Sequence, residues 1–265
     1  MDLRVRNKGY LIVGGTSGMG LAAAAVLAAD GADLVIAGRN ADKAHAAAAE
    51  LAAIEGAGRV LGLAADVAQP DGADPLVSTA VDFLGGLDGV AITSGLIGHE
   101  PFDMPEEHWR ATFDDVLMSV VRVARTALPH LVSRGGGTFV TTSAFSIHSP
   151  QAARIPYTAL KSAVATVTKG IAKDYGKHNV RANCIAPGAI ETDGLHALRA
   201  KLATETGRAY DEALEHHMIE EWGMNIALRR PGQPHEVGEL IAFLLSPLAG
   251  YVTGALINID GGSDF

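Results

Sequence analysis

The sequence predicts an α/β protein, namely a single-domain, Rossmann-like doubly wound parallel sheet with helices on both faces and a helical substrate lid. Three observations lead to this fold class. Short apolar runs alternate with Ala-rich helical stretches along most of the chain. A glycine-rich turn joins the first apolar run to the first helical stretch. No repeat or linker divides the 265 residues, a length that one α/β domain commonly reaches.

The N-terminal third sets the pattern for the rest. Tyr10–Val13 is a continuous apolar run, as expected for a strand covered on both faces, and Leu21–Ala29 is a helix that ends at Asp30-Gly31. Strands that alternate with helices in this way form βαβ units and hence a parallel sheet. The further expected strands are Leu34–Ala37, Val60–Ala64, Gly89–Ile92, Thr138–Thr142, Val180–Ile185 and Ala255–Ile259. The further expected helices are Ala41–Ile54, Glu106–Leu131, Tyr157–Tyr175 and Glu236–Leu245.

One segment departs from the alternation. Glu191–Arg229 is polar, charged and mostly helical, and it is too long for a connecting loop. We therefore expect one domain over residues 1–265, with residues 191–229 as a lid over a site. Met218 and Trp222 are apolar residues of this lid that could close a pocket, although a lid simply folded on the core would use them equally well.

Composition excludes several classes of partner. The chain is 48% apolar and 19% charged, with a net charge of −9 and interspersed acids and bases, so we expect neither nucleic acid nor an anionic membrane as a partner. The single cysteine, Cys184, rules out a disulfide within the chain and is compatible with a cytoplasmic location. The histidines lack ligand spacing, so no metal is expected. Glycines and Pro247 divide the two long uncharged stretches, which argues against a membrane span.

The glycine-rich turn predicts a dinucleotide site. Glycines between a strand and a helix allow a tight turn and a close approach of the backbone to a pyrophosphate, and the helix N-terminus offers free N–H groups. The spacing differs from the usual G-x-G-x-x-G, and no lysine follows as in a P-loop. The residues expected at the cofactor are Gly14, Thr16, Ser17, Gly18, Met19 and Gly20.

The end of the second strand bears on the choice between NAD and NADP. A carboxylate there would bind the ribose 2′-hydroxyl, but this chain has Arg39-Asn40. Arg39 could hold a 2′-phosphate through a charged, forked hydrogen bond, or it could be a solvated arginine at a strand end. The sequence therefore favours NADP(H) and leaves NAD(H) possible.

A phenol and an ammonium group lie on one helical face. Tyr157 and Lys161 are four residues apart, and a nearby cation favours the phenolate and lowers a tyrosine pKa. Such a tyrosine is a usable general acid–base for an alcohol and ketone pair. Ser143 ends the preceding strand, where its hydroxyl could hold the substrate oxygen.

With these residues in place, the chain resembles the short-chain dehydrogenase/reductase (SDR) family. The matches run along the whole sequence, and their order and spacing are specific together. They are the glycine turn, Asp66-Val67, Ser143, Tyr157-x-x-x-Lys161, the run Asn183 to Gly188 followed by Thr192, and the closing Asp260-Gly261-Gly262.

The resemblance implies roles for further residues. Asp66 and Val67 would contact the adenine, Lys161 would also hold the nicotinamide ribose, and Tyr157 would exchange the proton while hydride passes between cofactor and substrate. Pro187, Gly188 and Ile190 would cover the nicotinamide, and Thr192 would bond its carboxamide or the phosphates. Ser94 and Gly95 are also expected at the cofactor. Phe145 and His148 fall where substrate contacts would cluster, or they are packed loop residues.

Three departures from the family pattern stand out. Ile92-Thr93-Ser94-Gly95 replaces the family's Asn-Asn-Ala-Gly. Val116 stands where the family has an asparagine that holds a water for proton relay, and valine cannot do this. Ser143 lies 14 residues before Tyr157, one more than expected, which makes Ser146 a lesser candidate.

The leading hypothesis is therefore an NAD(P)-dependent oxidoreductase that interconverts an alcohol and a ketone or aldehyde, on a medium-sized hydrophobic or cyclic substrate. The alternative, motivated by Val116, is a redox-silent dinucleotide-binding regulator or scaffold on the same fold. Apolar residues around the helix Tyr157–Tyr175, together with the resemblance, predict a homotetramer or a homodimer, with a second interface near Tyr251–Ile259.

Overall fold

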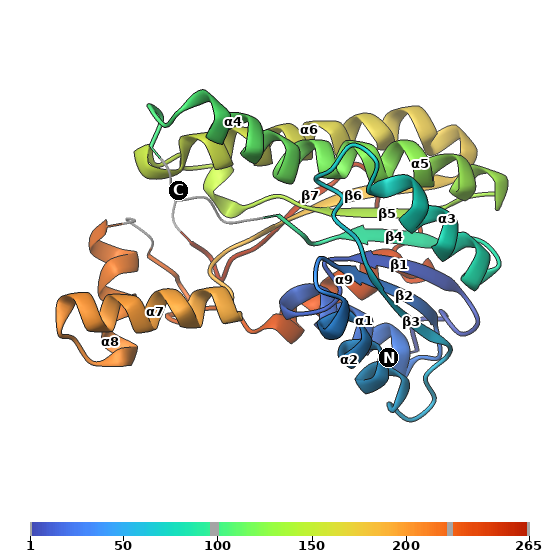
Figure 1. Ribbon diagram of the computed structural model, residues 1–265, viewed down its shortest axis with the longest axis horizontal. Coiled ribbons are helices and arrows are strands. Elements are labelled where there is room, and N and C mark those ends of the chain that lie inside the picture. Colours follow the sequence, from blue (N-terminus) through green and yellow to red (C-terminus); the bar gives the residue numbers. More distant parts are fainter. Residues whose placement is uncertain (1, 96–100, 222–224, 264–265) are drawn as a thin grey trace.

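A seven-stranded, fully parallel sheet forms the centre of the computed structural model, with the strand order β3-β2-β1-β4-β5-β6-β7 (Figure 1). The structure describes residues 2–95, 101–221 and 225–263. The strands are β1 (Gly9–Val13), β2 (Asp33–Gly38), β3 (Val60–Ala64), β4 (Gly89–Ile92), β5 (Gly137–Thr142), β6 (Val180–Pro187) and β7 (Leu256–Ile259). The order reverses between β1 and β4, which confirms the doubly wound class expected from the sequence.

Helices cover both faces of the sheet. Successive side chains of each strand point to opposite faces, so apolar strands make both faces apolar. In β1, Tyr10 and Ile12 pack in one hydrophobic cluster while Leu11 and Val13 pack in the other. The helices of the first face are α1 (Gly18–Ala29), α2 (Ala41–Ala52) and α9 (Pro234–Leu245). Those of the second face are α3 (Ala73–Leu84), α5 (Ser119–Ser133) and α6 (Ile155–Tyr175).

Helix α3 is an element that the sequence analysis missed. Its buried residues recur at helical spacing, but Pro75 and Gly72 mark its start with residues typical of a loop. Pro75 falls in the first turn of the helix, where a proline costs little because the first N–H groups have no partner within the helix.

The long helix expected over Glu106–Leu131 is present but interrupted. It consists of α4 (Glu106–Phe113), a π-helical turn at Asp114–Met118, and α5. By length and composition alone, Glu106–Ser133 could cross a membrane. In the structure its apolar side, which includes Val123 and Leu131, packs in the core against one face of the sheet.

The segment predicted as a lid is helical and lies beside the sheet rather than on either face of it (Figure 1). It contains α7 (Asp193–Thr206), α8 (Tyr210–His216) and a π-helical turn at His217–Glu221. A third hydrophobic cluster holds it together, made of Phe145, Leu195, Leu202, Ala213, Leu214, Met218 and Ile226. Met218 therefore packs inside the lid's own core, whereas Trp222 lies outside the described residues.

Candidate active site

A cavity of about 480 Å³ opens at the carboxyl ends of the central strands, where the strand order reverses. This is the place where open α/β sheets bind their ligands. The cavity is lined by the glycine turn at one end and by Ser143, Tyr157 and Lys161 at the other. The sheet topology thus brings together residues that are more than 100 positions apart in the sequence.

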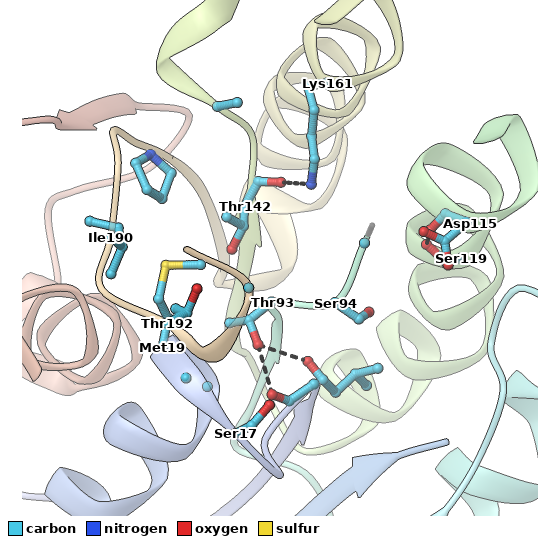
Figure 2. Close-up of a pocket in the computed structure, with 18 of the residues that line it drawn as sticks. Ser17, Met19, Thr93, Ser94, Asp115, Ser119, Thr142, Lys161, Ile190 and Thr192 are labelled. Atoms are coloured by element: carbon cyan, nitrogen blue, oxygen red, sulfur yellow. Dashed lines mark hydrogen bonds between the residues drawn. The ribbon is translucent and has the colours of Figure 1, made fainter. Parts of the chain in front are cut away.

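Close packing shapes the glycine-turn end. Gly14 has a φ of +83°, and a Cβ there would lie 2.7 Å from the backbone nitrogen of Ser94. A Cβ on Gly20 would collide with the Gly14 carbonyl oxygen and with the Thr93 hydroxyl. Thr93 in turn donates to the carbonyl oxygens of Val13 and Gly14, each at 3.2 Å (Figure 2). The backbone is therefore held close to the cavity, as a pyrophosphate site requires.

The first turn of α1 points its free N–H groups and its partial positive charge into this end of the cavity. Ser17 precedes the helix as its N-cap residue and makes no capping hydrogen bond with its side chain. Thr16, Gly18 and Met19 complete the lining here.

The far side of this end carries Arg39 and Asp66, which both line the cavity. Arg39 is exposed at the end of β2. The Asp66 carboxylate accepts from the Ala68 backbone nitrogen at 3.1 Å, with Val67 buried beside it. Asn40 does not line the cavity, because it caps α2 by accepting from the Lys43 backbone nitrogen at 2.9 Å.

Six further residues that the family resemblance places at the cofactor lie on two sides of the cavity. Ser94 and Gly95 follow β4 on one side, and the residues after β6 lie on the other, namely Pro187, Gly188, Ile190 and Thr192. Figure 2 shows Ile190 and Thr192 facing the cavity from the side opposite Asp115 and Ser119. Within the described part of the chain, the buried hydroxyl groups of Ser94 and Thr142 have no hydrogen-bond partner.

Ser143, Tyr157 and Lys161, the catalytic residues that the sequence predicts, line the end of the cavity away from the glycine turn, which we call the catalytic end. Lys161 donates from Nζ to the Thr142 carbonyl oxygen at 2.8 Å (Figure 2). Its Nζ lies 5.6 Å from the centre of the Tyr157 ring. The Ser143 hydroxyl donates to the carbonyl oxygen of Lys161 at 2.8 Å. Ser146 also lines the cavity, where its Oγ accepts from the Thr158 hydroxyl at 3.1 Å.

Burial is the largest cause of the pKa shifts of Lys161 and Tyr157. It lowers the pKa of Lys161 to about 8, and the negative charge of the Asp115 carboxylate opposes this lowering. It raises the pKa of Tyr157 to about 12, and the positive charge of Arg154 opposes that rise. The lowering of the Tyr157 pKa expected from its spacing to Lys161 is thus outweighed in the chain alone, since only 8% of this tyrosine is exposed.

The π-helical turn at Asp114–Met118 determines which side chain faces the cavity near the position of the family's asparagine. Val116 is 1% exposed and belongs to the hydrophobic core. Its neighbour Asp115 lines the cavity instead, together with Ser119, whose hydroxyl donates to the Asp115 carbonyl oxygen at 2.6 Å. The polar group on this helix is therefore one residue earlier than the family spacing indicates.

The two residues expected to contact substrate have different places. Phe145 lines the cavity and packs against the lid. His148 is exposed, lies 3.2 Å from the Asn258 side chain, and does not line the cavity. Arg154 and Asp193 also line the cavity, and neither is predicted from the sequence. No group of three or more potential metal ligands occurs in residues 2–95, 101–221 and 225–263.

Comparison with known proteins gives a consistent picture. A family model described as "Enoyl-(Acyl carrier protein) reductase" matches residues 13–264. The "Dehydrogenase/reductase SDR family member 4" of Oryctolagus cuniculus is 31% identical over 97% of this chain and 94% of its own length. This chain belongs to the short-chain dehydrogenase/reductase family. It is an SDR oxidoreductase, as the motifs indicated.

Solved structures of other SDR proteins share the fold over nearly the whole chain. L-Sorbose reductase from Gluconobacter frateurii, solved with NADPH and L-sorbose, is 31% identical with a TM-score of 0.93, covering 99% of this chain and 98% of that one. 7α-Hydroxysteroid dehydrogenase, solved with NADH and 7-oxo glycochenodeoxycholic acid, is 28% identical with a TM-score of 0.87, covering 99% and 96%. These two SDR relatives take very different substrates with different nicotinamide dinucleotides.

Proposed function

We propose that this SDR protein interconverts an alcohol and a ketone or aldehyde, with NADP(H) in preference to NAD(H). The observation that carries the proposal is the meeting of Ser143, Tyr157 and Lys161 at one end of a cavity whose other end is the glycine turn. A redox-silent binding protein, the alternative that Val116 raised, would have no use for this trio.

The cavity suits a nicotinamide dinucleotide. The backbone at Gly14 and Gly20 leaves no room for a Cβ, and the free N–H groups of α1 can bind phosphate oxygens. The hydroxyl groups of Ser94 and Thr142, which have no partner in the described structure, are available to bind the ribose and nicotinamide. NADPH and NADH in the two related structures support this cofactor class, and the exposed Arg39 supports NADP(H) through a 2′-phosphate contact.

The three polar residues have separate tasks in this reaction. The bound nicotinamide supplies or accepts the hydride. The Tyr157 hydroxyl gives a proton to the substrate oxygen in reduction and takes it back in oxidation. The Ser143 hydroxyl holds the same oxygen, and the Lys161 ammonium binds the ribose and draws the Tyr157 pKa downward when it moves from the Thr142 carbonyl to the cofactor.

The lid and Phe145 supply the apolar side of the substrate site. Phe145 lines the cavity beside Thr192–Gly194, through which the chain enters the lid. A medium-sized substrate with an apolar or cyclic body would pack here. Met218, which could have closed the pocket or packed inside the fold, lies in the lid's own cluster, so Phe145 carries this part of the proposal.

A screen of the purified protein tests the function. We expect NADPH fluorescence to decay when a ketone or aldehyde substrate is added, and NADP⁺ to be reduced with the matching alcohol. Cofactor binding without turnover of any carbonyl compound in a broad panel would instead support the redox-silent alternative.

We also propose a homo-oligomer, a tetramer or a dimer. Tyr251 is fully exposed and Leu256 on the edge strand β7 is 40% exposed, as expected for an interface at this edge. By contrast, Val164 and Ile171 of α6 are buried within the chain, so the case for a helix-to-helix interface weakens. Analytical ultracentrifugation at micromolar concentration should give a mass above the 27.4 kDa of one chain, and a mass of one chain would contradict the proposal.

A further inference from the structure

Arg122 of α5 joins two segments that lie far apart in the sequence. Its Nη1 donates to the Ala68 carbonyl oxygen at 2.7 Å, and its Nη2 donates to the Asp114 carboxylate at 2.5 Å. Only 13% of the Arg122 side chain is exposed, so solvent screens these charged hydrogen bonds less than those of a surface ion pair. Arg122 does not itself line the cavity, and the reaction proposed above assigns it no task.

The residue that Arg122 binds belongs to the connection between β3 and α3. Residues 65–72, which the structure describes in full, form turns and contain neither helix nor strand. Asp66, Val67 and Ala68 of this connection line the cavity on the side of the glycine turn. Because connections without regular structure move more than the elements they join, an anchor from α5 affects the geometry of this cavity wall.

Ala68 is held on both sides. Its carbonyl oxygen accepts from Arg122, and its N–H donates to the Asp66 carboxylate at 3.1 Å. One turn further along α5, the Thr126 hydroxyl donates to the Asp74 carboxylate in the first turn of α3, at 2.5 Å. Residues four apart lie on one helical face, so a single face of α5 binds the connection and the start of the helix that follows it.

The orientation of the Asp66 carboxylate matters for recognition of a base. An ionised carboxylate only accepts hydrogen bonds, and the exocyclic amino group of adenine is a donor. The family resemblance expects Asp66 at the adenine. A carboxylate selects adenine over a base with an oxo group at that position only while its oxygen stays aimed at the amino group.

We propose that Arg122 is a positioning residue for adenine recognition, which acts through Ala68 on the Asp66 carboxylate. Asp114 holds the other side of the guanidinium and so keeps it directed at Ala68. The proposal rests on the proposed function, because it needs a bound nicotinamide dinucleotide whose adenine lies at Asp66. It adds a residue outside the cavity that determines which base the cavity accepts.

Two matched cofactors separate this role from a general effect on binding. We would measure the Kd of NADPH and of deamino-NADPH, in which hypoxanthine replaces adenine and an oxo group replaces the amino group, by nicotinamide fluorescence and without any substrate. The wild type should prefer NADPH by at least about tenfold, since the hydrogen bond to the charged Asp66 is lost in deamino-NADPH.

Variants of the arginine then test its role. Arg122→Gln should reduce the preference for NADPH to less than about threefold, while the affinity for deamino-NADPH changes by less than about threefold. Arg122→Lys keeps the charge but has no fork to span Ala68 and Asp114, so its preference should lie between the two, and it tests the same point if Arg122→Gln does not fold. Arg125→Gln, on the exposed side of α5, is the matched control and should behave like the wild type.

A double-mutant cycle tests whether Arg122 acts through Asp66. Asp66→Ala removes the acceptor and should abolish the preference for NADPH. Adding Arg122→Gln to Asp66→Ala should then change the ratio of the two Kd values by less than about twofold, because residues that act in series are not additive. A further loss of preference in the double variant would contradict action through Asp66.

The outcomes separate the proposal from the proposed function. An unchanged preference in Arg122→Gln would overturn the role of Arg122, and so would an equal loss of affinity for both cofactors, which is the result expected of a merely structural anchor. Binding of NADPH and deamino-NADPH with equal affinity by the wild type would also overturn it and leave the proposed reaction intact. A wild type that binds neither cofactor would overturn both.

Discussion

The two ends of the cavity are built in different ways. The core of the glycine-turn end is backbone at the junction of β1 and α1, where a Cβ on Gly14 or Gly20 would collide with Gly14, Thr93 or Ser94, and Arg39 and Asp66 lie on its far side. The catalytic end is made of larger polar side chains that come from α6, from the end of β5 and from irregular turns, namely a π-helical turn at Asp114–Met118 and 3₁₀ turns at Phe145–Ile147 and Ala152–Arg154. We therefore expect substitutions at the first end to change cofactor binding and substitutions at the second end to change the chemistry.

If the two ends act separately in this way, Tyr157→Phe should give the largest difference between the effect on turnover and the effect on cofactor affinity. Turnover should fall by at least about 10²- to 10⁴-fold, because the phenol provides the proton. The cofactor affinity should stay within about threefold, because the ring keeps its packing. Steady-state rates and NADPH fluorescence titrations check both quantities, and a near-wild-type rate would refute the assignment of Tyr157.

Gly20→Ala probes the opposite end. The added Cβ meets the Gly14 carbonyl and the Thr93 hydroxyl, so we expect cofactor affinity to drop by at least about tenfold and stability by about 1–3 kcal/mol. Gly170→Ala is the matched control, because a Cβ on this helical glycine meets no atom within 4 Å. It should raise stability by about 0.5–1 kcal/mol. Equal NADPH binding by Gly20→Ala and the wild type would contradict close packing as the basis of this end.

Arg39→Asp sharpens the account of the same end. It removes a partner for the 2′-phosphate and adds an acceptor for the 2′-hydroxyl, so NADP(H) affinity should fall by about tenfold or more and NAD(H) affinity should rise. Lys43→Asp makes the same change of charge on exposed surface outside the cavity and should leave the preference unchanged. Tighter binding of NAD(H) by the wild type would show that Arg39 is only a solvated strand-end residue.

The smallest expected effect is a shift in pH dependence at the catalytic end. The Asp115 carboxylate stabilises the Lys161 cation, so it raises the pKa of that lysine, which burial has lowered to about 8. Asp115→Asn should lower this pKa further, and the high-pH limb of the kcat/KM profile should move to lower pH, with less than about threefold loss at pH 7. Asp115→Glu, which keeps the charge, should shift less. A profile that is identical in Asp115→Asn would mean that this carboxylate does not act on Lys161.

The same contrast explains what the sequence could predict. The glycine turn and the apolar strands follow from local chemistry, so the sequence predicts the fold class, and all the residues that it predicts at the cofactor except Asn40 line the cavity. Asn40 does not line the cavity because its side chain caps α2, and its position next to Arg39 in the sequence does not reveal this. Helix α3 was missed because a proline in the first turn resembles a break.

The catalytic end was predicted only where a spaced motif exists. Tyr157 and Lys161 have one, but Asp115 does not, because a π-helical turn shifts the register of one helix by a residue and leaves no mark in the sequence. Arg154 ends the short 3₁₀ turn Ala152–Arg154 before α6, where nothing in the sequence signals its burial. His148 had the expected position in the chain, but the turn that carries it directs it to solvent and Asn258.

A crystal structure with bound NADP⁺ would show directly whether the two ends of the cavity form one active site. The account predicts one extended dinucleotide along the cavity, with its phosphates at the N-terminus of α1, its 2′-phosphate at Arg39, and its nicotinamide beside Tyr157 and Ser143. Lys161 should then leave the Thr142 carbonyl and contact the ribose. A dinucleotide in the reverse direction, or one bound elsewhere with Tyr157 and Lys161 unaffected, would contradict the claim that these two ends form one active site.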